Sequence, residues 1–204
     1  MQRFLTRIKA QYKTSIETFG AISHGVLWTN GIEQMRRFKI LLDLITPTQD
    51  FSINDLGCGY GALLDYLHEH NLVPTQYYGY DITPEMLTLA SSRFSMQNIV
   101  FIQSSYPTQQ ADYTLISGTF NLCDDAPYQQ WLEYVFERLL LSFSSSSKAV
   151  VFNGLSTSKT PKVDGLFYIN KEDILNLCYY GLNASKVKSY DDKTLEEWSI
   201  AVFK

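Results

Sequence analysis

Three alternating glycines, placed between a short apolar segment and a helical segment, most constrain the fold of this chain. They belong to the sequence Asp55-Leu56-Gly57-Cys58-Gly59-Tyr60-Gly61, which ends the apolar segment 51–56 and opens an apolar-periodic stretch over residues 60–70. This order predicts a strand, a tight turn and a helix. Glycines in such a turn adopt positive φ angles and let a ligand approach the main chain, because no Cβ stands in the way. The motif therefore predicts a ligand-binding turn at the end of a strand.

The alternation of strands and helices continues along the chain. We expect further strands at residues 77–81, 99–103, 113–117, 149–153, 185–190 and 198–203, and helices from residue 84, over 127–143 and over 171–180. The serine run at 144–147 is expected to be a loop. Strands that alternate with helices form a parallel sheet covered on both faces, whereas the last two strands lie too close for a crossover helix and pair as an antiparallel hairpin. The predicted fold is α/β, doubly wound, with a mostly parallel seven-stranded sheet and an antiparallel C-terminal strand.

Residues 1–45 precede the first motif strand and are predicted to form an N-terminal helical cap. Their apolar periodicity indicates one helix to about Phe19, a break over residues 20–30 and a second helix that ends before Pro47. We expect one domain over residues 1–204, in which residues 50–204 form the α/β core.

Two acidic residues decide which ligand the glycine turn would bind. Asp81 ends the second expected strand, where a carboxylate can accept hydrogen bonds from both ribose hydroxyls of an adenosine. Gly57, Gly59 and Ala62 also satisfy the looser glycine pattern of nicotinamide enzymes. Asp55, however, stands where the pyrophosphate of a dinucleotide would lie, so it would repel that group and attract an ammonium. This favours S-adenosylmethionine, which carries an ammonium, over a dinucleotide.

Taken together, the run from Asp55 to Gly61, the later Asp81 and residues 111–118 resemble successive motifs of class I S-adenosylmethionine-dependent methyltransferases. The resemblance covers roughly residues 50–155. Outside the glycine motif, the segments His24-Gly25 to Trp28, Gln34, Arg37-Phe38 and 117–121 are similar to a little-characterised group of small bacterial methyltransferases. That closer similarity identifies no acceptor.

The resemblance implies a role for each motif residue. Gly57, Gly59 and Gly61 would line the methionine end of the donor, and Asp81 would hold its ribose. Ile82 would pack on the adenine, while Ser117 and Gly118 would offer backbone groups near the donor's amine.

The sequence departs from the family pattern after the third strand. An acidic residue often contacts the adenine amino group there, but this chain has Gln103-Ser104-Ser105. Ser105 would accept a weaker hydrogen bond. After the fourth strand, Ser117-Gly118-Thr119-Phe120 replaces the Asn-Pro-Pro-Tyr or Asp-Pro-Pro-Tyr sequence of amino-group methylases, which weakens the case for adenine or glutamine N-methylation. No residue is assigned as a catalytic base.

The N-terminal segment is expected to close over the donor. This hypothesis places Trp28 near the sulfonium, which an indole face attracts, and Arg37 near the donor's carboxylate, which a guanidinium binds through two hydrogen bonds. The competing interpretation makes Trp28 a core aromatic residue of a helix that only packs on the sheet. Trp28, Phe120, Phe167 and Tyr168 are the aromatic residues expected near an acceptor pocket.

Composition narrows the classes of partner and compartment. Seventeen basic and 21 acidic side chains give a net charge of -4, so no global field attracts nucleic acid or anionic lipid. The three cysteines, widely spaced, suggest neither a disulfide framework nor a metal site. The chain shows no signal-peptide pattern and no apolar run long enough to cross a membrane. We therefore expect a cytoplasmic protein that does not span a membrane.

These observations lead to one principal functional hypothesis and two alternatives. The principal hypothesis is methyl transfer from S-adenosylmethionine to a small-molecule acceptor. The alternatives are a non-catalytic S-adenosylmethionine-binding module and a nicotinamide-dependent oxidoreductase. The oligomeric state is left open.

Overall fold

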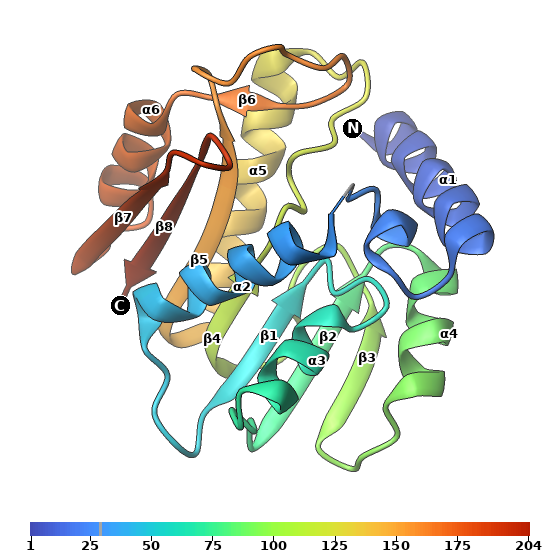
Figure 1. Ribbon diagram of the computed structural model, residues 1–204. Helices are drawn as coiled ribbons and strands as arrows, with labels where there is room; N and C mark the ends of the chain where they lie inside the picture. Colours follow the sequence, from blue (N-terminus) through green and yellow to red (C-terminus); the bar gives the residue numbers. More distant parts are fainter. Residues whose placement is uncertain (29) are drawn as a thin grey trace.

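The computed structural model describes residues 1–28 and 30–204, which form an eight-stranded mixed sheet flanked by helices (Figure 1). The strand order is β3-β2-β1-β4-β5-β8-β7, and β6 pairs with β5 off this path. Strands β1 to β6 pair in parallel, whereas β8 is antiparallel to both β5 and β7. The strands are β1 (Ser52–Leu56), β2 (Gln76–Asp81), β3 (Ile99–Gln103), β4 (Ala111–Ile116), β5 (Ser146–Ser156), β6 (Tyr168–Ile169), β7 (Lys186–Asp192) and β8 (Glu197–Phe203).

This topology confirms the predicted doubly wound α/β fold with an antiparallel C-terminal strand, and it corrects the strand count from seven to eight. The additional strand, β6, has only two residues and therefore shows no periodicity in the sequence. The loop expected over residues 144–147 is also wrong from Ser146 onward. The Ser146 hydroxyl donates to the carbonyl of Ser142 and contacts the Thr114 hydroxyl, so this serine is buried at the start of β5.

Some helix ends coincide with capping residues in the sequence. Gly20, at φ +70°, follows the last residue of α1, and the Asn30 side chain accepts a hydrogen bond from the Ile32 amide at the start of α2. The helix predicted over 171–180 changes from α to π geometry at Leu177. The helices are α1 (Gln2–Phe19), η1 (Ser23–Val26, a 3-10 helix), α2 (Gly31–Ile45), α3 (Ala62–Glu69), α4 (Pro84–Arg93), α5 (Tyr128–Ser144), α6 (Lys171–Asn176) and η2 (Leu177–Gly181, the π turn).

Two hydrophobic clusters fill the two sides of the sheet. One includes Trp131 and Leu139 of α5 together with Phe152 of β5, and the other includes Leu41 of α2 and Leu64 of α3. Helices α5 and α6 therefore cover one face, while α2 and α3 cover the opposite one (Figure 1).

Helix α1 lies beyond the carboxyl ends of the strands, beside α4 (Figure 1). The apolar side of α1 packs against the core through the buried side chains of Phe4, Ile8 and Ile16. Lys13 pairs with Glu85 of α4 at 2.7 Å, and Arg7 pairs with Asp124 and Asp125 of the loop after β4. The helix thus bridges two elements of the α/β core across the end of the sheet where ligands of such folds bind.

Candidate functional site

A cavity of about 970 Å³, its open mouth included, lies at the carboxyl ends of β1, β2 and β4. Its floor is the glycine turn, and α1, the η1 segment and α2 form the opposite wall. Nine of the predicted site residues line it: Trp28, Asp55, Gly57, Gly59, Asp81, Ile82, Ser105, Ser117 and Gly118. The remaining two, Gly61 and Arg37, do not.

The glycine turn adopts the backbone angles that its sequence predicts. Gly57, Gly59 and Gly61 all have positive φ, at +81°, +53° and +88°. A Cβ on Gly57 would overlap the side chain of Thr119, whose hydroxyl donates to the Leu56 carbonyl at 2.8 Å. A Cβ on Gly61 would lie 2.8 Å from the ring of Phe94. Glycine is therefore required at position 61 by packing against Phe94, at the N-terminus of α3 and outside the cavity.

Asp81 faces the cavity at the end of β2. Its two carboxylate oxygens accept hydrogen bonds from the amides of Gly59, at 3.1 Å, and Thr83, at 2.8 Å. Burial raises its pKa, and these amides oppose the rise. Because an ionised carboxylate can accept about four hydrogen bonds, both oxygens keep capacity for ribose hydroxyls.

Asp55, at the end of β1, is a buried carboxylate. Burial raises its pKa to about 7, the nearby charge of Asp81 adds to the rise, and a 2.5 Å hydrogen bond from the Tyr77 hydroxyl opposes it. Within residues 1–28 and 30–204, no Lys or Arg pairs with Asp55. An ammonium group bound in the cavity would compensate this charge, so the residue suits the amino end of the expected donor.

Ser105 lines the cavity where the adenine contact was expected, and it has a partner that the sequence did not predict. Its hydroxyl oxygen accepts a hydrogen bond from Arg138 of α5 at 2.8 Å. The Arg138 guanidinium also lies over the ring of Tyr134, 5.0 Å from its centroid. Arg138 thus fixes the position of Ser105 from the helix behind it.

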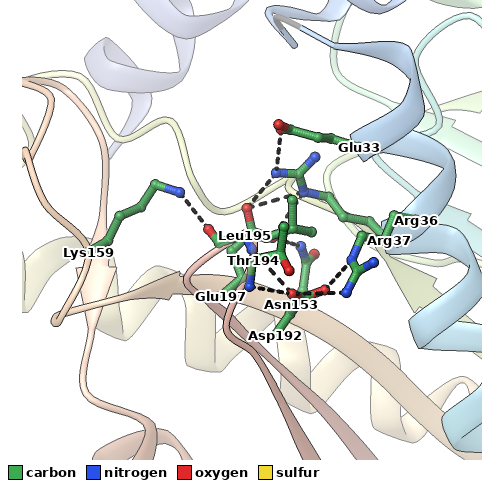
Figure 2. A network of polar contacts seen from close by, with 9 residues as sticks. All are labelled: Glu33, Arg36, Arg37, Asn153, Lys159, Asp192, Thr194, Leu195 and Glu197. Carbon is green, nitrogen blue, oxygen red and sulfur yellow. Dashed lines mark hydrogen bonds and ion pairs between the residues drawn. The ribbon is translucent and has the colours of Figure 1, made fainter.

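Trp28 lines the cavity, whereas Arg37 lies behind it. The Arg37 guanidinium pairs with Glu197 of β8, at 2.6 Å for the closest contact, and both side chains are buried (Figure 2). It also stacks on Trp28, with 3.9 Å between Cζ and the ring centroid. The expectation that Arg37 reaches the donor's carboxylate is therefore corrected: its guanidinium is held by a carboxylate 160 positions along the chain.

The sequence analysis missed most of the cavity's apolar wall. Helix α1 contributes Leu5, Ile8 and Tyr12, and α5 contributes Trp131 and Tyr134. The N-terminal segment was expected to close over the donor, but which side chains of α1 would line the cavity was not predicted. Of the four aromatic residues expected near an acceptor, Trp28 and Phe120 line this cavity, Phe167 lines a smaller one beside it, and Tyr168 lines neither.

The part of the chain that the structure describes contains neither a candidate metal site nor a candidate membrane-spanning helix. No group of three or more His, Cys, Asp or Glu side chains there could hold a metal ion. No helix among the same residues is both long and apolar enough to cross a membrane.

Comparisons with known proteins agree with this geometry. A family model described as a methyltransferase domain matches residues 53–140. The chain is 35% identical over 164 residues to Rv1506c of Mycobacterium tuberculosis, which is named as a methyltransferase, and the match covers 79% of this chain and 98% of that protein. It is 27% identical over 190 residues to phosphoethanolamine N-methyltransferase 3 of Arabidopsis thaliana, covering 88% of this chain and 36% of that one.

Among solved structures, magnesium protoporphyrin IX methyltransferase of Synechocystis with bound S-adenosylmethionine superimposes with a TM-score of 0.63 at 11% identity. That match covers 85% of this chain and 80% of the other and shows a shared fold. With the glycine turn, the two carboxylates and these relatives in agreement, the chain belongs to the class I S-adenosylmethionine-dependent methyltransferases.

Proposed function

We propose that this enzyme methylates a small acceptor with an apolar or aromatic body and no negative charge. When bound, S-adenosylmethionine supplies an electrophilic methyl group on a sulfonium. Asp81 would hold the donor's ribose, Asp55 its ammonium, and Ile82 and Ser105 its adenine. Gly57, Gly59, Ser117 and Gly118 would contact the methionine part through their backbones. Arg37 is left out of this assignment because it lies outside the cavity.

The composition of the cavity wall supports the proposed class of acceptor. Beyond the donor residues, the wall is largely apolar and aromatic, with members from α1, from the loop after β4 and from α5: Leu5, Ile8, Tyr12, Phe120, Trp131 and Tyr134. No Lys or Arg is among the described residues that line the cavity, whereas Asp55 and Asp81 are. An anionic acceptor would therefore find no Lys or Arg side chain among the described residues of the cavity wall to pair with it. Nucleic acid is disfavoured for the same reason.

Positioning is the proposed source of catalysis. The cavity's own thiol and phenols stay protonated at neutral pH and so cannot accept a proton, because burial raises the pKa of Cys58, Tyr60 and Tyr134. Holding two reactants in line can lower a barrier by about 7–11 kcal/mol without any base. The aromatic wall would supply this by orienting a flat acceptor and excluding water.

Label transfer tests the proposal. The protein would be incubated with methyl-labelled donor and with cell metabolites separated into anionic, neutral and cationic fractions. We expect label in the neutral or cationic fraction, and none with Asp81→Ala. Label in the anionic fraction alone would contradict the acceptor class. Donor binding without transfer to any fraction would favour the alternative, a non-catalytic binding module. The cytoplasmic location expected from the sequence stays a prediction.

A further inference from the structure

Five residues from different parts of the chain form a closed ring of contacts behind the cavity. Arg37 of α2 stacks on Trp28 and donates to Glu197 of β8 through Nε, at 2.9 Å, and Nη2, at 2.6 Å. The side-chain Nδ2 of Asn153, on β5, donates to the Glu197 carboxylate at 2.9 Å. Its side-chain Oδ1 accepts a hydrogen bond from the Gly118 backbone N–H at 2.8 Å. The indole of Trp28 in turn lies so close to Gly118 that a Cβ there would overlap it.

The ring has two members at the cavity and three behind it. Trp28 and Gly118 line the cavity, while Arg37, Glu197 and Asn153 are at least 96% buried and do not line it. A buried ion pair contributes little net stability, because the loss of hydration offsets the attraction. Its fork-shaped hydrogen bonds do fix the plane of the guanidinium, and the indole stacks on that plane.

We propose that Arg37 and Glu197 are positioning residues that hold Trp28 against Gly118 and thereby shape the donor site. This inference rests on the proposed function, since it assumes that the donor binds in the cavity whose wall includes Trp28 and Gly118. Asn153 completes the path by holding the Gly118 amide from the opposite side. The ring links the N-terminal segment to the loop after β4, so disturbing the buried pair loosens a cavity wall to which neither member of the pair belongs.

The neighbouring residue provides a matched control. Arg36, also on α2, pairs with Asp192 of β7 at 2.5 Å, as Figure 2 shows beside the Arg37 pair. It joins the same helix to the same hairpin, but the contacts described for it do not include Trp28. Arg36→Met therefore removes a second, more exposed helix-to-hairpin pair without opening the ring.

The test measures the dissociation constant of S-adenosylhomocysteine by calorimetry, together with the melting temperature without ligand. The main variant is Arg37→Met combined with Glu197→Gln, which removes both buried charges and keeps an acceptor for Asn153. We expect its dissociation constant to rise at least about tenfold, whereas Arg36→Met stays within about twofold of the parent. In a Trp28→Ala background the same double change should have almost no effect, because residues that act through one another are not additive.

Each result decides the question. Parental affinity in the double variant, an equal loss in the Trp28→Ala background, or an equal loss in Arg36→Met would overturn the proposal. If the double variant does not fold, Arg37→Lys replaces it. Lysine keeps the charge beside Glu197 but loses the flat fork, so weaker binding only when Trp28 is present supports the ring, and unchanged binding refutes it. If the parent itself does not bind S-adenosylhomocysteine, the proposed function fails, not this inference alone.

Discussion

Asp55 is proposed to bind the donor's ammonium as an ionised carboxylate, but that ionised form destabilises the protein when no ligand is bound. Burial raises its pKa to about 7, so the folded state ionises it less readily than the unfolded state does. The stability of the folded state therefore falls as the pH rises from about 4, where the unfolded carboxyl ionises, to about 7, where the folded one does. Ionising it in the empty cavity costs on the order of a few kcal/mol, which a bound ammonium would offset.

We predict that Asp55→Asn raises the melting temperature of the unliganded protein by several degrees at pH 8, by less at pH 5, and hardly at all below pH 4. The asparagine oxygen can still accept the Tyr77 hydroxyl, so local geometry is kept. Donor binding should weaken at least about tenfold at pH 8. Thermal scans and calorimetry across this pH range check both parts. A variant less stable than the parent at pH 8, or one that binds donor equally well, would contradict this account.

Asp81 is the second residue with a proposed contact, and its loss should affect binding more than folding. We predict that Asp81→Ala weakens donor binding by about 2–4 kcal/mol, the range for losing charge-assisted hydrogen bonds. Asp112→Ala is the control. That carboxylate accepts from the Ser52 amide at the opposite end of the sheet, so its removal should lower stability and leave donor affinity unchanged. Unfolding of Asp81→Ala, or parental affinity, would remove the ribose assignment.

At the residue scale, the sequence predicted contacts that are encoded locally. The turn from Asp55 to Gly61 and the strand-end Asp81 could be placed because a strand, a turn and a helix follow one another in the chain. Arg37 could not, because its partner Glu197 is brought to it only by the C-terminal hairpin. The support of Ser105 by Arg138 was missed for the same reason.

At the element scale, prediction depended on length and composition. The longer strands and helices were found, whereas two-residue β6 was not, and buried serine hydroxyls made the start of β5 look like a loop. The N-terminal segment was predicted to close over the donor, but the side chains of α1 that line the cavity needed the structure, since an apolar helix face does not say which of its residues contact a ligand site.

Helix α1 is the element that we expect to respond most to ligand. It lies over the cavity mouth, and half-exposed pairs such as Lys13 with Glu85 hold it at the surface. Such exposed ion pairs contribute little to stability, about 0–1 kcal/mol each. We predict that S-adenosylhomocysteine slows amide hydrogen exchange across α1, while exchange in α6, which does not line the cavity, stays unchanged. Equal protection of both helices, or none in α1, would argue against its closing over the donor.

For the whole molecule, ligand binding and folding are linked through the same cavity. The residues proposed to hold the donor stand at or just after the ends of β1, β2, β3 and β4, so the donor contacts several elements at once. A ligand that binds only the folded state stabilises it by about 2.7 kcal/mol at 100 times its dissociation constant.

We therefore predict that S-adenosylmethionine and S-adenosylhomocysteine each raise the melting temperature, whereas NADH and NADPH do not. For a chain of 204 residues, that stabilisation corresponds to a shift of about 5–10 °C. The dinucleotides should fail because Asp55 lies beside the glycine turn, where their pyrophosphate would meet a buried carboxylate. Asp81→Ala, scanned at the same ligand concentrations, should lose most of the shift and so tie it to this cavity. A shift with NADH but none with saturating donor or product would reverse the choice between the two cofactors.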